Sequence, residues 1–212
     1  MMMTQSLQRM LTLLGASLLA ACCVQSAHAQ QYKVSAEEPE LDSLFSPQLG
    51  EPKDFRPKEW LEVEAKMMVQ VAPEPKSKTV DRITVRWYVA VANPDQRGTF
   101  MLFTREVKHV NIPAGEEIYC SVYMSPASIR RILGVAKNPE KAVEVVSYEV
   151  IVNGEPQAYG TNNRRFKHGW WNQGGEKLIR SEVVPLLDKS QTPFSIMWWD
   201  RYAEVDPKSK DR

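Results

Sequence analysis

The side chains of this chain that could carry out catalysis do not fall into a recognisable catalytic motif. The sequence has three histidines and three cysteines. It lacks the spacing of a nucleophile elbow, of a zinc-binding helix with paired histidines, of a phosphate-binding glycine loop and of a calcium loop. Because no nucleophile can be paired with a base from the sequence, we expect no enzymatic activity, no cofactor and no metal site.

His109 and Cys120 each fall within a segment of alternating β pattern. His109 shares a face with Val107, and a histidine in that position is more often a satisfied core residue than a metal ligand. Cys120 shares an apolar face with Val122 and Met124, which predicts a buried and inert thiol. It is the only cysteine beyond the N-terminal segment, so we expect no intrachain disulfide.

The passage RRFKHGWW, residues 164–171, has the composition of a binding surface. Arginine and tryptophan are the residue types most enriched at binding hot spots. The candidate interaction residues here are Arg164, Arg165, Trp170 and Trp171. Neighbouring residues of an extended strand point to opposite faces, so we expect one tryptophan of the pair to fill the core and the other to face outward.

The same argument applies to Trp198 and Trp199, which precede an aspartate and an arginine. One exposed tryptophan from each pair would form either a platform for stacking sugars or a patch for docking proteins. Simple packing beneath a loop is the third alternative.

Residues 1–29 have the order of a secretory signal. A positive charge at Arg9 is followed by the apolar run 10–24 and by Ala-His-Ala at 27–29, which predicts export. A lipoprotein box, Leu-Ala-Ala-Cys, ends at Cys22 and would attach a diacylglycerol there. Both processing sites remain open, and the expected location is the periplasm or the cell surface, with an outer-membrane anchor if Cys22 is lipidated.

The charge of the chain limits the kinds of partner it could bind, and its length limits the number of hydrophobic cores. The formal net charge is +1, and loss of Arg9 with the signal would bring it to zero. A neutral domain has no electrostatic attraction for nucleic acid or for anionic lipid, so a membrane contact would come only through the lipid anchor. The remaining residues are enough for one hydrophobic core.

Residues 30–57 are rich in proline and are expected to form an extended arm. Its four prolines, at positions 39, 47, 52 and 57, forbid a regular helix and disfavour a central strand. Leu44 and Phe45 are more apolar than a spacer needs. The arm either covers a face of the following domain or pairs with the sheet edge of another subunit, and we expect it to serve assembly rather than domain stability.

The rest of the chain, residues 58–205, reads as a series of strands. The first two, 59–72 and 82–93, alternate strictly, and Trp87 lies on the inward face of the second. A local turn would make this pair antiparallel. Further strands are expected over residues 99–112, 118–124, 141–152 and 155–160, with two or three more before the solvated tail at 206–212.

Two local signals interrupt the strands. Ser125, Pro126 and Gly134 have the order of an N-cap, a first turn and a left-handed closing residue around one short helix. Asn153-Gly154 predicts a tight hairpin. About seven strands with one inserted helix indicate an all-β fold, an immunoglobulin-like antiparallel β-sandwich.

The order of these segments resembles a known family. A secretory signal, a proline-rich arm, EWLEVEAKMMVQV, RITVRWYVAVAN and the aromatic end with RRFKHGWWNQGGEKLI and FSIMWWDRYAEV are similar to the Ig-like pilus-associated surface proteins of verrucomicrobial, Akkermansia-type pilus gene clusters. The resemblance implies an Ig-like sandwich, related in shape to archaeal type IV pilus subunits, that acts in a surface assembly without enzymatic activity. The long apolar N-terminal helix of a bacterial type IV pilin is missing, which favours an accessory or alternative structural component.

Two hypotheses of function follow from the residues and the resemblance. The first is a structural and interaction component of a pilus-like or secretion-linked bacterial surface assembly, with protein partners that include further copies of itself as a homo-oligomer, and with contact to host or mucus. The second is a carbohydrate-binding β-sandwich module that stacks a glycan on its exposed tryptophans.

Overall fold

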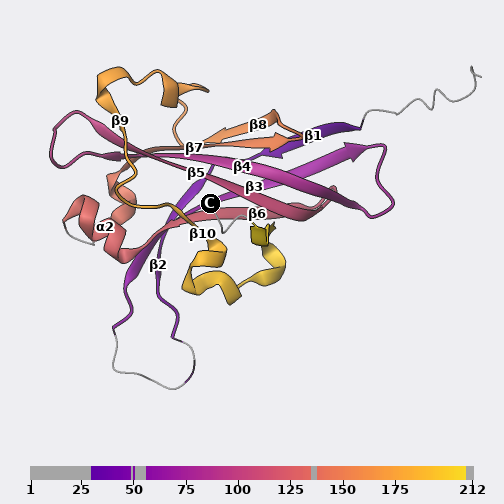
Figure 1. Ribbon diagram of the computed structural model, residues 1–212, viewed down its shortest axis with the longest axis horizontal. Helices are drawn as coiled ribbons and strands as arrows, with labels where there is room; N and C mark the ends of the chain where they lie inside the picture. The colour runs from indigo at the N-terminus through magenta and orange to yellow at the C-terminus, as the bar shows by residue number, and fades with distance from the viewer. Residues whose placement is uncertain (1–29, 49, 51–55, 135–137, 209–212) are drawn as a thin grey trace, which may run out of the picture. The chain divides into compact units, whose positions relative to one another are not determined.

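Two sheets pack face to face in the computed structural model, which describes residues 30–48, 50, 56–134 and 138–208 (Figure 1). The sheet around β3 contains β1 (Gln31–Ala36), β2 (Glu40–Phe45), β3 (Glu59–Ala72), β6 (Glu117–Met124) and β10 (Leu187–Asp188). The sheet around β4 contains β4 (Thr79–Ala92), β5 (Phe100–Pro113), β7 (Val143–Val152), β8 (Glu155–Thr161), β9 (Leu178–Arg180) and β11 (Glu204–Val205). All strand pairs are antiparallel except β5 with β9. The predicted all-β, Ig-like fold class is confirmed.

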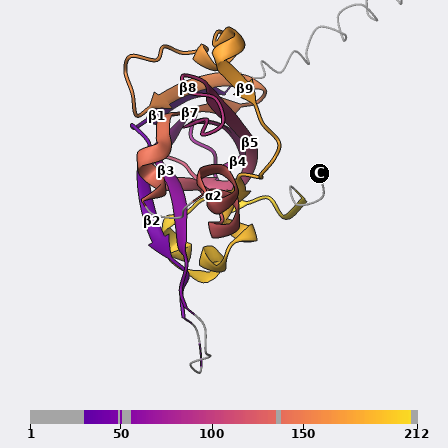
Figure 2. The same cartoon turned by 90° about the vertical axis from the view of Figure 1, so that its left-hand side faces the viewer.

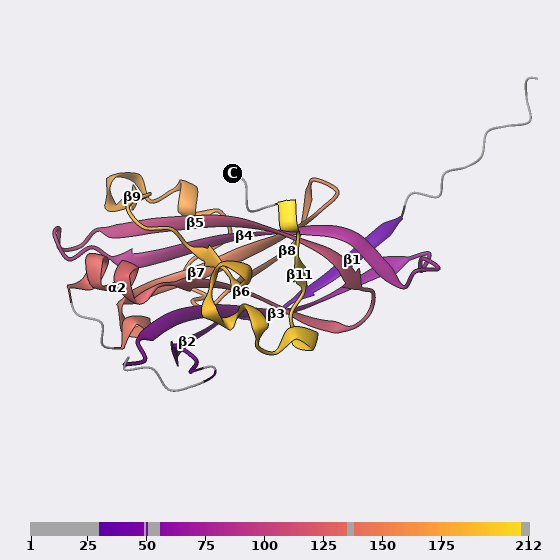
Figure 3. The same cartoon turned by 60° about the horizontal axis from the view of Figure 1, so that its bottom comes forward.

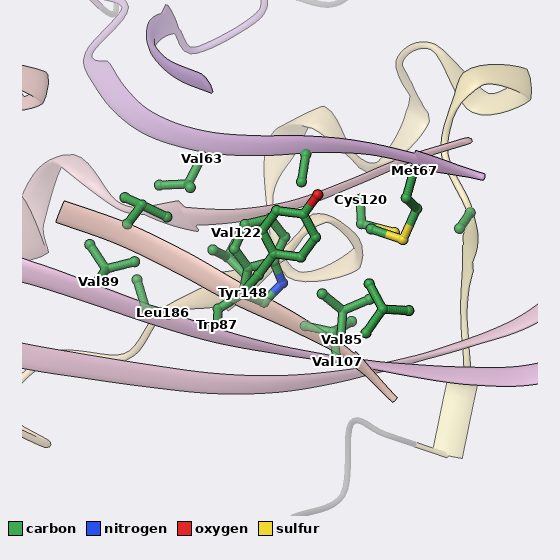
Figure 4. Packing of buried hydrophobic residues seen from close by; sticks show 14 of the residues in the cluster. Val63, Met67, Val85, Trp87, Val89, Val107, Cys120, Val122, Tyr148 and Leu186 are labelled. Carbon is green, nitrogen blue, oxygen red and sulfur yellow. The ribbon is translucent and has the colours of Figure 1, made fainter. Parts of the chain in front are cut away.

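The core fills the space between the two sheets (Figure 4). Trp87 is fully buried, and its ring lies 5.2 Å from that of Tyr148. His109 and Cys120 are also buried there, as their strand patterns predicted. The inward faces of β3 and β4 are apolar because each strand buries one side of its pleat against the other sheet.

The expected pairing of the first two long strands is wrong. β3 and β4 belong to different sheets, and the turn between them carries the chain across the sandwich. β3 pairs with β6, and β4 pairs with β5 and β7. Each strand has one apolar face, and two such faces are buried best when they meet across the core, which a flat hairpin would not allow.

The segment expected to form an arm supplies two strands of the β3 sheet. β1 pairs with the C-terminal half of β3, from Gln31 opposite Ala72, and β2 pairs with its N-terminal half, from Glu40 opposite Glu64. Residues 31–45 thus pair with β3 of their own domain, and apolar side chains such as Val34 and Leu41 pack against its core. This segment is therefore part of the domain, and the expectation of an arm that covers a face or pairs with another subunit is wrong for these residues. Leu44 is half-buried and Phe45 is exposed, whereas residue 49 and residues 51–55 lie outside the described part.

The local turn and cap signals are confirmed. Asn153 and Gly154 both have positive φ, 51° and 84°, and join β7 to β8. Helix α2 (Pro126–Leu133) begins after Ser125, whose side chain accepts a hydrogen bond from the amide of Ser128. Such caps satisfy amide groups that the helix itself leaves unpaired.

The C-terminal part follows the open edges of both sheets (Figure 3). β10 pairs with β6 and β11 pairs with β5, so the last strands close one side of the sandwich. The predicted additional strands are present but contain only two or three residues each. Short 3₁₀ helices take up much of the remaining sequence: η1 (Pro139–Ala142), η2 (Trp170–Asn172), η3 (Gly175–Lys177), η4 (Lys189–Gln191), η5 (Pro193–Ile196) and η6 (Trp199–Arg201).

Candidate functional site

The two tryptophan pairs do not alternate between core and solvent, and this prediction is wrong. Trp170 and Trp171 begin η2 and are 7% and 6% exposed. Trp198, with a φ of 54°, precedes η6, and it and Trp199 are 46% and 66% exposed. The prediction required an extended backbone, and neither pair has one. One pair is therefore structural and the other pair is available at the surface.

Trp170 and Trp171 cover the outer face of the β4 sheet. The Trp171 ring stacks on Tyr88 with centroids 3.8 Å apart and an interplanar angle of 10°. The indole nitrogen of Trp170 donates to the hydroxyl of Ser147 at 2.8 Å. Together they form a second, smaller apolar cluster with Ala90, Leu102 and Val145 on the far side of the sheet from the main core.

The carboxylate of Glu149 forms hydrogen bonds at the edge of this cluster. The hydroxyl of Tyr88 donates to Glu149 Oε2 at 2.8 Å, and His168 Nε2 lies 2.9 Å from Glu149 Oε1. Burial, together with Glu149, raises the pKa of Tyr88 to about 12. One carboxylate oxygen thus binds Tyr88 of β4, and the other binds His168 of the loop that follows β8. Tyr88 and Glu149 were not identified from the sequence, where they read as ordinary strand residues.

An open pocket of about 440 Å³ lies beside these tryptophans. Aromatic side chains from β5 and from the loop line it, namely Phe100, Phe166 and Trp170. Three exposed cations, Arg165, Lys167 and Lys177, surround them, with Glu144 as the one acidic residue of the lining. We call this feature the aromatic–basic pocket. Arg164, the other predicted arginine, is not part of its lining and instead pairs with Glu38 at 2.6 Å.

The exposed Trp198 lies near a row of carboxylates on the outer face of the β3 sheet. Glu40 and Asp42 on β2 stand directly opposite Glu64 and Glu62 on β3. These four residues line a pocket of about 280 Å³ together with Leu44 and Trp198. We call these six residues, with Arg201, which also lines the pocket, and Trp199, which follows Trp198 in the chain, the acidic–aromatic surface. Like charges directly opposite on neighbouring strands are destabilising, so this arrangement lowers the stability of the sheet.

Hydrogen bonds from three side chains relieve the repulsion on the β3 side. Tyr123 donates to Glu62 at 2.5 Å, Tyr202 donates to both glutamates, and Arg201 pairs with Glu64 at 2.5 Å. Burial still raises the pKa of Glu62. Within the described part of the chain, neither Glu40 nor Asp42 has a basic group within ion-pair distance.

The loop that carries Trp198 is stabilised by hydrogen bonds from Lys189. The ammonium group of Lys189 donates to the carbonyl oxygens of Phe194 and Met197 and lies 4.6 Å from the ring centre of Tyr202. Burial lowers the pKa of this ammonium group. Asp188 caps η4 and pairs with Arg105 at 2.8 Å. These contacts fix the backbone beneath the exposed tryptophans, and none of them is evident in the sequence.

Other kinds of site are not seen among the described residues. No group of three or more histidine, cysteine or acidic side chains there could hold a metal ion. Burial raises the pKa of the Cys120 thiol and lowers that of His109 to about 4, so both are neutral at physiological pH. No helix in this part of the chain is long and apolar enough to cross a membrane. The predicted signal and Cys22 lie outside the described residues.

Comparisons with known proteins identify relatives of the whole domain. A family model described as pilus-associated-like matches residues 25–209. A crystal structure of a protein from Akkermansia muciniphila is 37% identical, covers 84% of this chain and 95% of its own, and superimposes with a TM-score of 0.78. No curated protein matches. The family is one of structural proteins that are not known as enzymes, and it indicates an extracellular or envelope location. The chain belongs to the family of Akkermansia-type pilus-associated proteins.

Proposed function

We propose that this protein is a non-enzymatic structural and interaction component of a pilus-like or secretion-linked surface assembly. Its family membership supports a role among pilus proteins. The observation that carries the interaction role is the exposure of three large apolar side chains within four residues: Ile196 at 64%, Trp198 at 46% and Trp199 at 66%. Clustered exposed apolar residues rimmed by charge are typical of protein-binding sites.

The backbone beneath these side chains favours binding. Lys189 holds the loop by donating to the carbonyl oxygens of Phe194 and Met197, so little conformational entropy is lost when a partner binds. Tryptophan adds a large contact area with only two side-chain torsions to fix. A partner protein of the assembly would therefore bind here with the loop already in its bound shape.

The N-terminal segment gives the expected route to the cell surface. Residues 1–29 would direct export, and lipidation of Cys22 would anchor the mature chain to the outer membrane. Mass spectrometry of the protein from envelope fractions tests this, because a lipidated N-terminus at Cys22 and a free N-terminus at Gln30 differ in mass. A chain that keeps residues 1–29 in the cytoplasm would contradict export.

Cross-linking in envelope fractions tests the proposed function. We expect the native protein to be cross-linked to pilus-assembly proteins and the Trp199→Ser variant to lose most of these links. Val183→Ser is the matched control, because Val183 is also exposed, at 52%, but lies outside the loop. Unchanged cross-linking of Trp199→Ser, or no link to any assembly protein, would contradict the proposal.

A glycan is the second candidate ligand, and one observation favours it. Trp198 lines the same pocket as Glu40 and Asp42, and carboxylates that accept hydrogen bonds from sugar hydroxyls beside an indole face suit carbohydrate binding. Trp170 and Trp171 no longer qualify, because both are buried. Contact with host mucus would then run through Trp198. An array of mucin glycans tests it, with Trp198→Ala expected to lose binding and Trp171→Phe to keep it, whereas no binding by the native domain would contradict this function.

A further inference from the structure

The two surfaces described above lie on opposite faces of the sandwich. The acidic–aromatic surface is formed by β2, β3 and the segment around η6, on the outer face of the β3 sheet. The aromatic–basic pocket lies over β4, β5 and β7, on the outer face of the β4 sheet. In Figures 1 and 2 the segments η2 and η3 stand on one side of the two sheets, and η4, η5 and η6 stand on the other.

The two surfaces carry opposite charge. Four carboxylates share the acidic–aromatic surface with one cation, Arg201. Three cations share the aromatic–basic pocket with one carboxylate, Glu144. Within the described residues, Arg165, Lys167 and Lys177 form no ion pair. Each surface therefore has a surplus of charge that the other could neutralise.

The strand pairing places carboxylates opposite one another, which lowers the stability of the isolated chain. Glu40 lies opposite Glu64 and Asp42 lies opposite Glu62, and opposed carboxylates on neighbouring strands lower the stability of a sheet. Arg201 and the tyrosines reach the two glutamates of β3, which leaves Glu40 and Asp42 exposed at the edge strand. Cations placed over this edge by a partner would relieve the repulsion.

The apolar parts of the two surfaces also match. Trp199 is the most exposed large apolar side chain among the described residues. The aromatic–basic pocket offers about 440 Å³ lined by Phe100, Phe166 and Trp170, which lies within the usual range of ligand pockets, about 300–1,000 Å³. An indole among aromatic rings with cations at the rim combines apolar burial with charge pairing.

We propose that copies of this chain associate head to tail, with the acidic–aromatic surface of one copy against the aromatic–basic pocket of the next and Trp199 inserted among its aromatic rings. This inference rests on the proposed function as a structural component. Two copies cannot use the same surface on each other, because acidic would then face acidic. The contact is heterologous, and such contacts build rings or open filaments rather than closed two-fold dimers.

Charge reversal on each surface tests the proposal. One variant carries Glu40→Lys with Asp42→Lys, and the other carries Lys167→Glu with Lys177→Glu. Each variant alone has two surfaces of the same sign, so we expect its self-association to be at least about 100-fold weaker than that of the native chain. An equal mixture restores opposite signs at both contacts and should recover association. Sedimentation velocity at low and high salt measures this, and salt should weaken the native contact.

Controls keep each outcome interpretable. Lys33→Glu with Lys76→Glu makes the same change of charge at exposed sites outside both surfaces and should leave association intact. Circular dichroism confirms that each variant folds, and Trp199→Ser tests the contact without a change of charge. A native chain that stays monomeric, variants that associate as it does, or a mixture that fails to recover association would overturn the proposal. Cross-links to other assembly proteins would survive such a result if the proposed function alone is right.

Discussion

Trp170-Trp171 and Trp198-Trp199 are the same dipeptide in two opposite environments. Both pairs lie in or beside a 3₁₀ helix. Each also has a left-handed residue at its start: Gly169, with a φ of 83°, precedes the first pair, and Trp198, with a φ of 54°, begins the second. The first pair is buried and the second is exposed. Local backbone conformation therefore does not decide which pair is covered.

The sheet beneath each pair makes the difference. The outer face of the β4 sheet offers Tyr88 as a stacking partner and Ser147 as an acceptor for the indole N–H group. The outer face of the β3 sheet instead carries four carboxylates, which line a pocket with Trp198. Burying an indole over those carboxylates would strip water from charged groups, which costs more than the apolar burial returns. The second pair consequently remains at the surface.

The largest loss of stability is expected at Trp87, which is fully buried in the core. Trp87→Ala should lower the free energy of unfolding by about 3–5 kcal/mol, because it empties the centre of the core. Trp87→Phe should cost less than about 1.5 kcal/mol, since it keeps an aromatic ring and removes an indole N–H group that has no hydrogen-bond partner among the described residues. Urea unfolding of both variants measures this. Equal losses would mean that Trp87 does not fill the core.

Trp171→Ala sharpens the comparison between the two pairs. It should lower the free energy of unfolding by about 3 kcal/mol, because it removes a ring stacked on Tyr88 and opens the small apolar cluster. Trp171→Phe, which keeps part of the stack, is the matched control. A loss as small as that of a surface substitution would show that the first pair is not structural.

The buried His109 should make the free energy of unfolding depend on pH, by about 2 kcal/mol between pH 7 and pH 5. Burial lowers its folded-state pKa to about 4, against about 6.5 in the unfolded chain. Between these two pKa values the unfolded chain therefore binds more protons than the folded chain. As the pH falls through this range, the free energy of unfolding decreases. Between pH 7 and pH 5 the native chain should lose about 2 kcal/mol more than His109→Leu. Glu62, whose folded-state pKa is raised, acts in the opposite direction in both proteins.

Unfolding of both proteins across this pH range measures the difference. Because Glu62 is present in each, subtraction removes its contribution. Parallel pH profiles for the native chain and His109→Leu would contradict a neutral buried histidine.

The smallest effect on stability is expected at the exposed pair. Trp199→Ala should change the free energy of unfolding by less than about 0.5 kcal/mol, because the side chain is largely in solvent. Thermal unfolding beside Trp171→Ala gives the contrast directly. A loss comparable to that of Trp171→Ala would place Trp199 in the fold rather than at a contact surface.

Much of the fold follows from periodicity and turn chemistry. The strand bounds 59–72, the inward position of Trp87, the capped helix after Ser125 and the Asn153-Gly154 hairpin are all local signals, and all are confirmed. The assignment of β3 and β4 to different sheets was missed, because a short turn between two amphipathic strands is compatible with a hairpin and with a crossing.

The candidate sites depended on contacts distant in sequence. The burial of both Trp170 and Trp171 requires Tyr88 and Ser147, which come from other strands. The acidic–aromatic surface exists only because β2 pairs with β3 in a register that sets carboxylate opposite carboxylate. No local pattern encodes that register, and residue types alone identified Trp198 and Trp199 as candidates without their acidic neighbours.

Zero-length carbodiimide cross-linking of mixed ¹⁴N- and ¹⁵N-labelled chains most directly tests the central claim, that the surface carrying the exposed pair contacts the aromatic–basic pocket of a second copy. The reagent joins a lysine amine to a carboxylate only when the two are in contact. The pair Lys66 and Glu37, 2.9 Å apart, is an internal control within one chain. The account predicts links of mixed isotope composition between Lys167 or Lys177 of one copy and Glu40 or Asp42 of another. Formation of the Lys66–Glu37 link with no such mixed links, or with mixed links only at other residues, would contradict it.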